Sequence, residues 1–97
     1  MTTYVMLATW TEQGIRDIAR SPTRLDALKK QLQELGGRFT AFYMTMGEYD
    51  FVLIYEAPDE AVAAHFTLVL GRQGNIRTRT MKAFSERAYR EIMASLA

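Results

Sequence analysis

The chain has 97 residues, and we expect residues 1–97 to form a single small domain. Hydrophobic residues make up 48% and charged residues 24% of the sequence, which is typical of a folded globular protein rather than a disordered one. The net charge of +1 provides no overall attraction to nucleic acid or to an anionic membrane. The absence of cysteine excludes disulfides, thiolate nucleophiles and thiolate metal sites.

The chain also lacks the usual signals for membranes and secretion. No apolar run approaches the roughly 20 residues that span a bilayer. The amino terminus, MTTYVMLATW, has neither the basic start nor the cleavage site of a signal peptide. We therefore expect a cytoplasmic protein that binds neither membrane nor nucleic acid.

The first third of the chain contains a strand and then a helix. Tyr4–Trp10 is rich in strand-forming residues and is expected to be the first strand. Pro22 disfavours helix at Ser21, so Glu12–Arg20 is expected to form a separate short helical turn. A longer helix should follow, with Ser21 as its N-cap, Pro22 at its first position and a left-handed stop at Gly36-Gly37. Its core-facing stripe consists of Leu25, Leu28, Leu32 and Leu35.

The remainder is expected to contain a hairpin, a second helix, a more polar fourth strand and a closing helix. The hairpin turns around Gly47-Glu48, and the second helix begins at Pro58-Asp59 and stops at Gly71. In order, these elements span Arg38–Met46, Tyr49–Glu56, Pro58–Leu70, Asn75–Ala83 and Phe84–Leu96.

Strand, helix, strand, strand, helix, strand is the order of the ferredoxin-like βαββαβ fold. We therefore predict an α+β domain with a four-stranded antiparallel sheet in the order four, one, three, two, plus an extra C-terminal helix. Both long helices should cover the same face of this sheet.

Both faces of the predicted sheet are apolar, although two helices can cover only one. Side chains alternate along a strand, so the third strand divides into Phe51, Leu53 and Tyr55 against Val52 and Ile54. The second strand divides into Phe39, Ala41 and Tyr43 against Phe42, Met44 and Met46. The first strand divides into Tyr4, Met6 and Trp10 against Val5 and Leu7. Leaving six large side chains in water would forfeit on the order of 10 kcal/mol. We expect a second copy to cover this face, giving a homodimer or higher oligomer; the alternative is that the final helix folds back over it.

Antiparallel pairing gathers several polar residues at one edge, which we call the rim. The rim is the end of the first strand and the start of the third and fourth strands, and its candidate ligand-binding residues are Trp10, Thr11, Gln13, Tyr49, Asp50, Asn75 and Arg77. Asp50 has two interpretations. It forms an ion pair with Arg77 or Arg79 or caps backbone amides, or it is a proton acceptor or ligand anchor in a pocket walled by Trp10 and Tyr49.

Other candidate sites are weaker. His65 is the only histidine and has no second metal ligand suitably spaced, so we interpret it as a core or interface residue. No phosphate-binding loop and no serine- or cysteine-based triad can be assembled. We predict no metal site and no cofactor.

Several short motifs occur in an order that resembles the GYD domain family. They are TEQG at 11–14, SPTR at 21–24, GG at 36–37, GEYD at 47–50, EAPDE at 56–60 and GNIRTRTMKAF at 74–84. The resemblance implies a bacterial or archaeal protein grouped with the dimeric α+β barrels. That group includes haem-degrading and quinol-oxidising monooxygenases and the ligand-sensing domains of transcriptional regulators. No haem-ligand pattern can be carried over to this chain.

Three functions remain open. The chain is a small-molecule binding or sensing module, a cofactor-independent monooxygenase- or isomerase-like enzyme with Asp50 as base, or a structural assembly unit. Four motifs converging on one edge favour the first of these.

Overall fold

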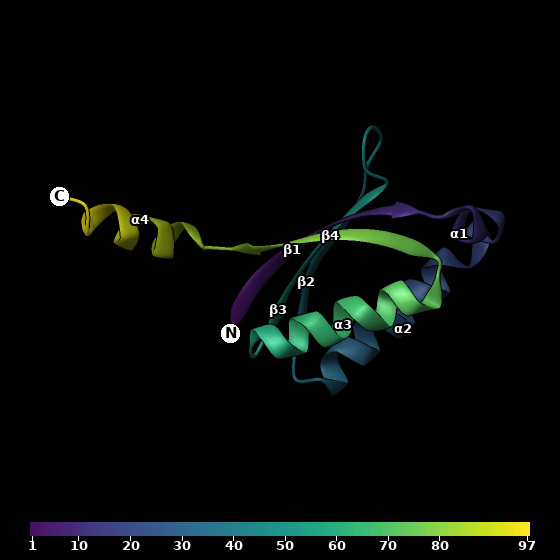
Figure 1. Ribbon diagram of the computed structural model, residues 1–97, viewed down its shortest axis with the longest axis horizontal. Helices are drawn as coiled ribbons and strands as arrows, with labels where there is room; N and C mark the ends of the chain where they lie inside the picture. The colour runs from purple at the N-terminus through teal and green to yellow at the C-terminus, as the bar shows by residue number, and fades with distance from the viewer.

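The computed structural model describes all 97 residues. Its elements follow the predicted order (Figure 1). They are β1 (Thr2–Trp10), α1 (Glu12–Arg16), the 3-10 turn η1 (Ile18–Arg20), α2 (Ser21–Glu34), β2 (Arg38–Met44), β3 (Phe51–Ala57), α3 (Glu60–Gln73), β4 (Ile76–Ala83) and α4 (Glu86–Ala94). None of the helices is both long and apolar enough to cross a membrane.

The four strands form one antiparallel sheet in the order β2-β3-β1-β4, which confirms the predicted topology. Strand β1 is central and pairs with β3 from Thr2↔Ala57 to Ala8↔Phe51 and with β4 from Thr3↔Ala83 to Trp10↔Ile76. Because directly opposed residues share a face, this register fixes which side chains point towards the helices.

Helices α2 and α3 cover the same face of the sheet (Figure 1). Leu28 and Leu32 of α2 are buried there, as are Phe66 and Leu70 of α3. They pack against the helix-facing side chains of β1 and β3. Among these, Tyr55 of β3 is fully buried. At about 25 cal/mol per Å² of apolar surface, this layer is the main source of stability in a domain of this size.

Three local expectations are corrected. Helix α2 begins at Ser21 with Arg20 at the N-cap and no side-chain cap, one residue earlier than predicted. Helix α3 does not stop at Gly71 but continues to Gln73, where Gly74 ends it with a φ of 80°. His65 lies exposed on α3, so its assignment to the core is wrong, while its assignment to an interface stays a prediction.

A β-bulge in β2 overturns the predicted faces of that strand. Phe39 opposes Tyr55 and Ala41 opposes Ile54, so two residues of β2 occupy the space of one on β3, with Thr40 as the extra residue. After the bulge Phe42 faces the helices, where its ring lies 5.2 Å from that of Phe51.

The bulge therefore leaves two residues of β2 on the opposite side of the sheet. Ala41 opposes Ile54 there and Tyr43 opposes Val52. We call this side the open face. For β1 and β3 the predicted alternation is confirmed, with Tyr4 and Met6 buried against the helices and Val5 and Leu7 on the open face.

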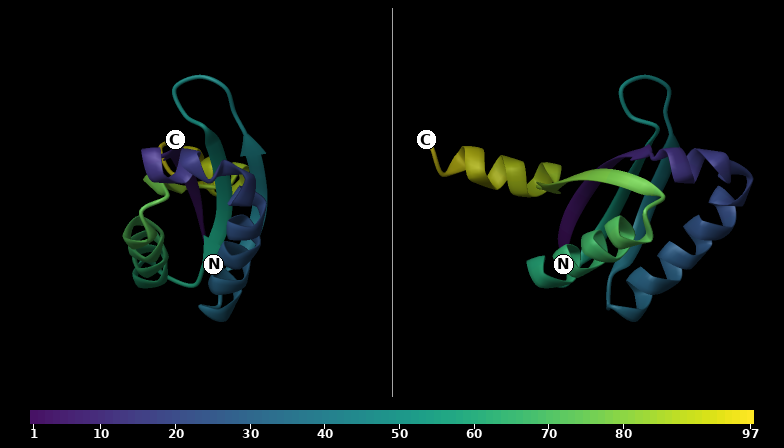
Figure 2. Two further views of the ribbon diagram at one scale, coloured as in Figure 1. Left: turned by 90° about the vertical axis from the view of Figure 1, so that its right-hand side faces the viewer. Right: turned by 45° about the vertical axis from the view of Figure 1, so that its right-hand side comes forward.

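Two segments project from the body of the molecule. Helix α4 continues in the direction of β4, away from the sheet, and has no buried residue (Figure 1). The loop between β2 and β3 also projects, and both views in Figure 2 show it beyond the end of the sheet. The alternative that the closing helix folds back over the sheet is therefore wrong for this chain.

Candidate functional site

Asp50 extends the pairing of β1 and β3 at the rim. Its carboxylate oxygen Oδ2 accepts a hydrogen bond from the Trp10 N–H at 2.9 Å. Its own N–H donates to the Ala8 carbonyl oxygen at 2.8 Å. No ion pair forms with Arg77 or Arg79; of the predicted structural roles, Asp50 has that of capping a backbone amide. That amide belongs to β1 rather than to the β2–β3 hairpin.

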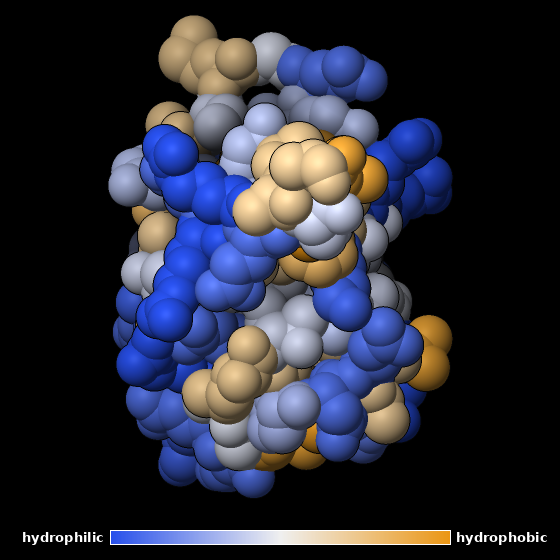
Figure 3. Space-filling view, turned by 90° about the vertical axis from the view of Figure 1, so that its left-hand side faces the viewer, coloured by the Kyte–Doolittle hydropathy of each residue, from blue (hydrophilic) through white to orange (hydrophobic).

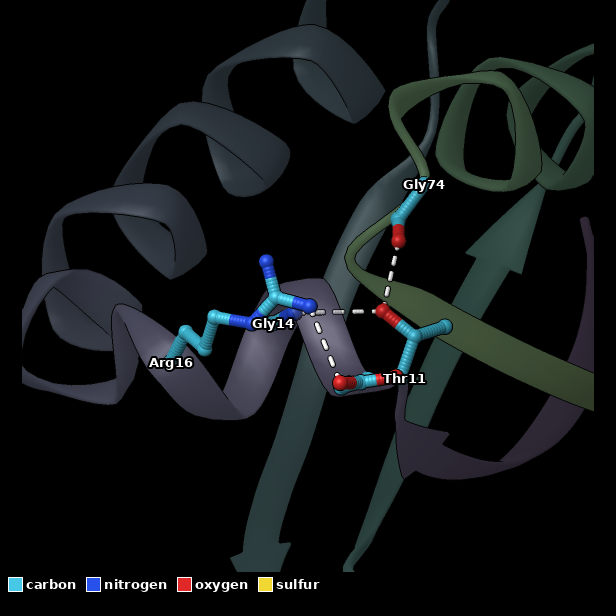
Figure 4. Close-up of polar contacts among 5 residues, drawn as sticks. Thr11, Gly14, Arg16 and Gly74 are labelled. Carbon is cyan, nitrogen blue, oxygen red and sulfur yellow. Dashed lines mark hydrogen bonds and ion pairs between the residues drawn. The ribbon is translucent and has the colours of Figure 1, made fainter.

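Thr11 joins two turns of the rim (Figure 4). As the N-cap of α1, its Oγ1 accepts from the Gly14 N–H at 3.1 Å and donates to the Gly74 carbonyl oxygen at 2.6 Å. The Thr11 N–H donates to the Asn75 carbonyl oxygen at 3.0 Å. A Cβ on Gly14 would lie 2.1 Å from that oxygen, so only glycine fits this close approach.

Gln13 and Asn75 contribute further bonds between the same two turns. Gln13 Nε2 donates to Asn75 Oδ1 at 3.0 Å and to the Gln73 carbonyl oxygen at 3.1 Å. The turn after β1 and the turn before β4 are thus held together by side chains that were candidate ligand contacts. Their hydrogen-bonding groups serve the fold in this conformation.

Trp10 and Tyr49 do not wall one pocket, because they line hollows on opposite faces of the sheet. Trp10 lies on the helix side, with its ring 5.7 Å from that of Phe51. The hollow there has a volume of about 30 Å³, enough for a water molecule and far below the roughly 300 Å³ of a typical ligand pocket. Its lining includes Arg24, Leu25, Phe42, Asn75 and Ile76.

Tyr49 borders a larger groove of about 260 Å³ on the open face. Arg77 and Arg79 also line this groove, together with Leu7, Thr9, Glu48 and Thr78. Both arginines are exposed, and neither has a carboxylate oxygen within 4.0 Å. The groove can therefore present two free guanidinium groups to an anionic ligand.

The centre of the open face is apolar and uncovered. Its central residues are half-buried, although they belong to the two central strands: Val5, Leu7, Val52 and Ile54. At its margins Tyr43 and Met81 are 63% and 49% exposed. An antiparallel sheet that faces water normally carries polar side chains on that side, so this surface is unusual for a single chain in water.

A group of buried hydroxyls was not found by sequence reasoning. Tyr4 Oη, Tyr55 Oη and Thr80 Oγ1 are buried without a hydrogen-bond partner, and the two phenol rings stack at 5.4 Å. Burial raises the pKa of both tyrosines. Alternation placed these rings in the core but could not show that their hydroxyls are unpaired.

The fold places this chain among the ferredoxin-like α+β domains, with two helices on one face of a four-stranded sheet and the other face bare. Residues 4–93 match the GYD domain family, and the chain belongs to that family. A similar curated protein is the glutamine synthetase and cystathionine beta-lyase binding protein of Thermus thermophilus. It is 34% identical over 84 residues, covering 86% of this chain and 88% of that protein.

Solved structures share the fold. The crystal structure of FFRP-DM1 matches with a TM-score of 0.62 at 20% identity, over 87% of this chain and 100% of that one. TTHA0845 from Thermus thermophilus matches with a TM-score of 0.54 at 24% identity, over 88% of this chain and 95% of that one. At these identities the likeness is one of fold alone.

Proposed function

We propose that this chain is a protein-binding module that works as a homodimer or higher oligomer, with a metabolic enzyme as its partner. The observation that supports self-association is the bare open face. Two helices cover one side of the sheet, α4 projects away from it, and the apolar residues of β1 and β3 on the other side have no cover.

The energetics favour a cover of the same shape and chemistry. The central residues Val5, Leu7, Val52 and Ile54 each gain on the order of 1 kcal/mol when their remaining surface leaves water. A second copy presents the same apolar surface and gives a two-fold interface in which each face buries the other. Two stacked sheets lie about 10 Å apart, so the side chains of the two faces would interdigitate.

The proposed partner follows from the similar Thermus protein. That relative is named for binding glutamine synthetase and cystathionine beta-lyase, and the similarity covers most of both chains. We infer that this chain also binds an enzyme of amino-acid metabolism, with glutamine synthetase as the first candidate. A homodimer offers each partner surface twice, which would strengthen the attachment to any enzyme that presents more than one binding site.

Self-association is tested by sedimentation and native mass spectrometry. The wild-type chain should form dimers of its 11.1 kDa protomer at micromolar concentration. Val52→Lys places a charge in the centre of the open face and should weaken dimerisation at least about tenfold. Gln33→Lys adds the same charge on the exposed side of α2 and should leave the dimer intact. A wild-type chain that stays monomeric would contradict the proposal.

Enzyme binding is tested by calorimetric titration with purified glutamine synthetase and cystathionine beta-lyase from the same organism as the chain. Saturable binding to either enzyme supports the proposal. An unrelated oligomeric enzyme of similar size is the control. Absence of heat and of co-sedimentation with both enzymes would remove the proposed partner while leaving self-association standing.

The open-face groove favours a second candidate function, binding of a small anionic molecule. Arg77 and Arg79 face it without carboxylate partners, and a second sheet stacked over the open face would enclose it. Guanidinium groups shielded from water need an anion, so a ligand with a carboxylate or phosphate group fits. Ligand retained by freshly purified protein in native mass spectra, and lost in Arg77→Gln, would support this role; unchanged spectra would count against it.

A further inference from the structure

Helix α4 has an apolar stripe that nothing in its own chain covers. Helical spacing puts four apolar side chains on one side of the helix, and these are 42–75% exposed: Tyr89, Ile92, Met93 and Leu96. Figure 3 views the molecule from the end that carries α4 and shows apolar residues in orange beside charged residues in blue. An isolated helix of this length is marginal in water, so α4 needs a surface to pack on.

The polar side of α4 argues against a membrane or nucleic acid as that surface. Glu86 pairs with Arg90 at 2.8 Å and Arg87 pairs with Glu91 at 3.5 Å, so the charges of the helix are balanced. Helices that bind anionic membranes or nucleic acid carry a basic face. The occupant of the α4 stripe must instead be apolar and close to neutral.

The β2–β3 hairpin provides a surface of this kind. Tyr43, Met44 and Met46 are 63%, 66% and 93% exposed, and Glu48 is the only charged side chain among residues 43–49. The hairpin and α4 leave the sheet at diagonally opposite corners, because β2 and β4 are the two edge strands and run in opposite directions. Figure 1 and the right-hand view of Figure 2 show both segments projecting from the body.

We propose that α4 is an arm that docks on the β2–β3 hairpin of a second copy of this chain. This inference rests on the proposed homodimer. A two-fold axis lying between the stacked open faces, along the other diagonal of the sheet, places each arm beside the hairpin of the other copy. The strands of the two sheets then cross at a steep angle, which corresponds to the orthogonal class of sheet packing.

The exposed area matches what a stable dimer needs. Met44 opposes Phe51 on the helix side of the sheet, so the arm can cover Tyr43 and Met46 but not Met44. Taking about 200 Å² for a large side chain in full contact with water, the α4 stripe offers on the order of 400 Å² and Tyr43 with Met46 about 300 Å². One arm and one hairpin from each copy together reach about 700 Å² per partner, within the range of a standard interface. The contact is also continuous with the open face between the two corners.

Site-specific cross-linking tests the contact, since the chain has no cysteine of its own. Chains carrying Met93→Cys and chains carrying Met46→Cys are mixed, allowed to exchange and mildly oxidised. A disulfide between the two different chains, identified by mass, is expected. Ala94→Cys, on the opposite side of α4, replaces Met93→Cys in the control and should give at most a trace of cross-linked product.

A second measurement uses charge rather than disulfides. Ile92→Glu should raise the dimer dissociation constant at least about tenfold, whereas Ala94→Glu should leave it within about twofold. Dimers that survive Ile92→Glu, together with Met93→Cys chains that link only to each other or not at all, would overturn the arm-to-hairpin contact while the homodimer stands. A wild-type chain that is monomeric in the sedimentation experiment would overturn both.

Discussion

Helices α3 and α4 both carry apolar side chains at helical spacing, yet those of α3 are packed into the core and those of α4 are bare. Helix α3 buries Ala63, Phe66 and Leu70, whereas α4 buries nothing. The difference lies in the connections. Because α3 joins two strands of the same sheet, its path must return across that sheet, and its apolar side is pressed onto β1 and β3. Helix α4 follows the last strand and is under no such constraint, so an apolar stripe alone does not determine where a helix packs.

The comparison is tested most strongly by truncating one apolar residue of each helix. Phe66→Ala should lower the free energy of unfolding by about 3–5 kcal/mol, because it empties a fully buried site beside Tyr55. Ile92→Ala should have a small effect in dilute protein and a larger one at high concentration, where the arm is covered. Urea denaturation at two protein concentrations measures both; a concentration-independent loss for Ile92→Ala would mean that α4 packs within its own chain.

Gly14 and Gly71 differ in the space available for a side chain: Gly14 is closely packed and Gly71 is not. Gly14→Ala should destabilise the fold by about 1–3 kcal/mol, since its Cβ would collide with the Asn75 carbonyl oxygen. Gly71→Ala, in α3, should stabilise the fold by about 0.5–1 kcal/mol, because its Cβ meets no atom within 4 Å and alanine favours helix. Thermal unfolding of the two variants gives the signs. If Gly14→Ala stabilised the fold as much as Gly71→Ala, the turn that carries Asn75 would have to move away from Gly14 at little cost.

Asp50 allows the structural and chemical roles of the rim to be compared. Asp50→Ala leaves the Trp10 N–H without its acceptor and should cost about 1–3 kcal/mol. Asp50→Asn keeps an oxygen acceptor and should cost less than about 1 kcal/mol. Chemical denaturation of both variants is the measurement. A stability loss from Asp50→Asn as large as that from Asp50→Ala would mean that the negative charge, rather than the acceptor, is what the rim needs.

The smallest expected effect concerns the buried phenols. Unfolded tyrosine ionises near its ordinary pKa of 10.0, whereas folded Tyr4 and Tyr55 hold their protons to higher pH because burial raises their pKa. Their contribution to stability is thus complete below about pH 10 and is lost as the pH rises through the folded pKa values. Tyr4→Phe should flatten this alkaline decline and change stability at pH 7 by less than about 1 kcal/mol. The free energy of unfolding is measured from about pH 9 to about pH 11.5; if its slope against pH were the same in Tyr4→Phe as in the wild type, the buried Tyr4 phenol would not be a source of the decline.

Much of the fold follows from patterns that the sequence states directly. The leucines of α2 recur every three or four residues, and β1 and β3 alternate regularly, so their faces could be assigned. The bulge at Thr40 could not be predicted, because no residue in Arg38–Met44 marks it; with the bulge in place, both Phe39 and Phe42 pack against the core. Gly71 and Gly74 are both plausible stops, and sequence spacing alone does not choose between them; the helix ends at Gly74, which has a left-handed φ of 80°.

The rim was predicted as a gathering of residues but not in its bonding. Strand order is enough to bring Asp50 and Trp10 to one edge. Whether the Asp50 carboxylate meets a guanidinium or a backbone amide depends on side-chain reach and on small differences in distance. Sequence spacing does not contain that information. The projection of α4 was missed for a similar reason, since its amphipathic pattern is compatible with a core on either its own chain or another.

The extra residue at Thr40 divides β2 into two stretches that are out of phase with each other. If the seven residues of β2 paired without the bulge, the ring of Phe42 would turn outwards and that of Tyr43 inwards; removing Thr40 would instead leave both rings where they are, because Phe39 and Ala41 already oppose successive residues of β3. The bulge thus absorbs one residue without exchanging the two faces of the strand. A one-residue insertion or deletion after Thr40 that no second bulge absorbed would exchange them, and would change the surface through which copies of the protein would meet.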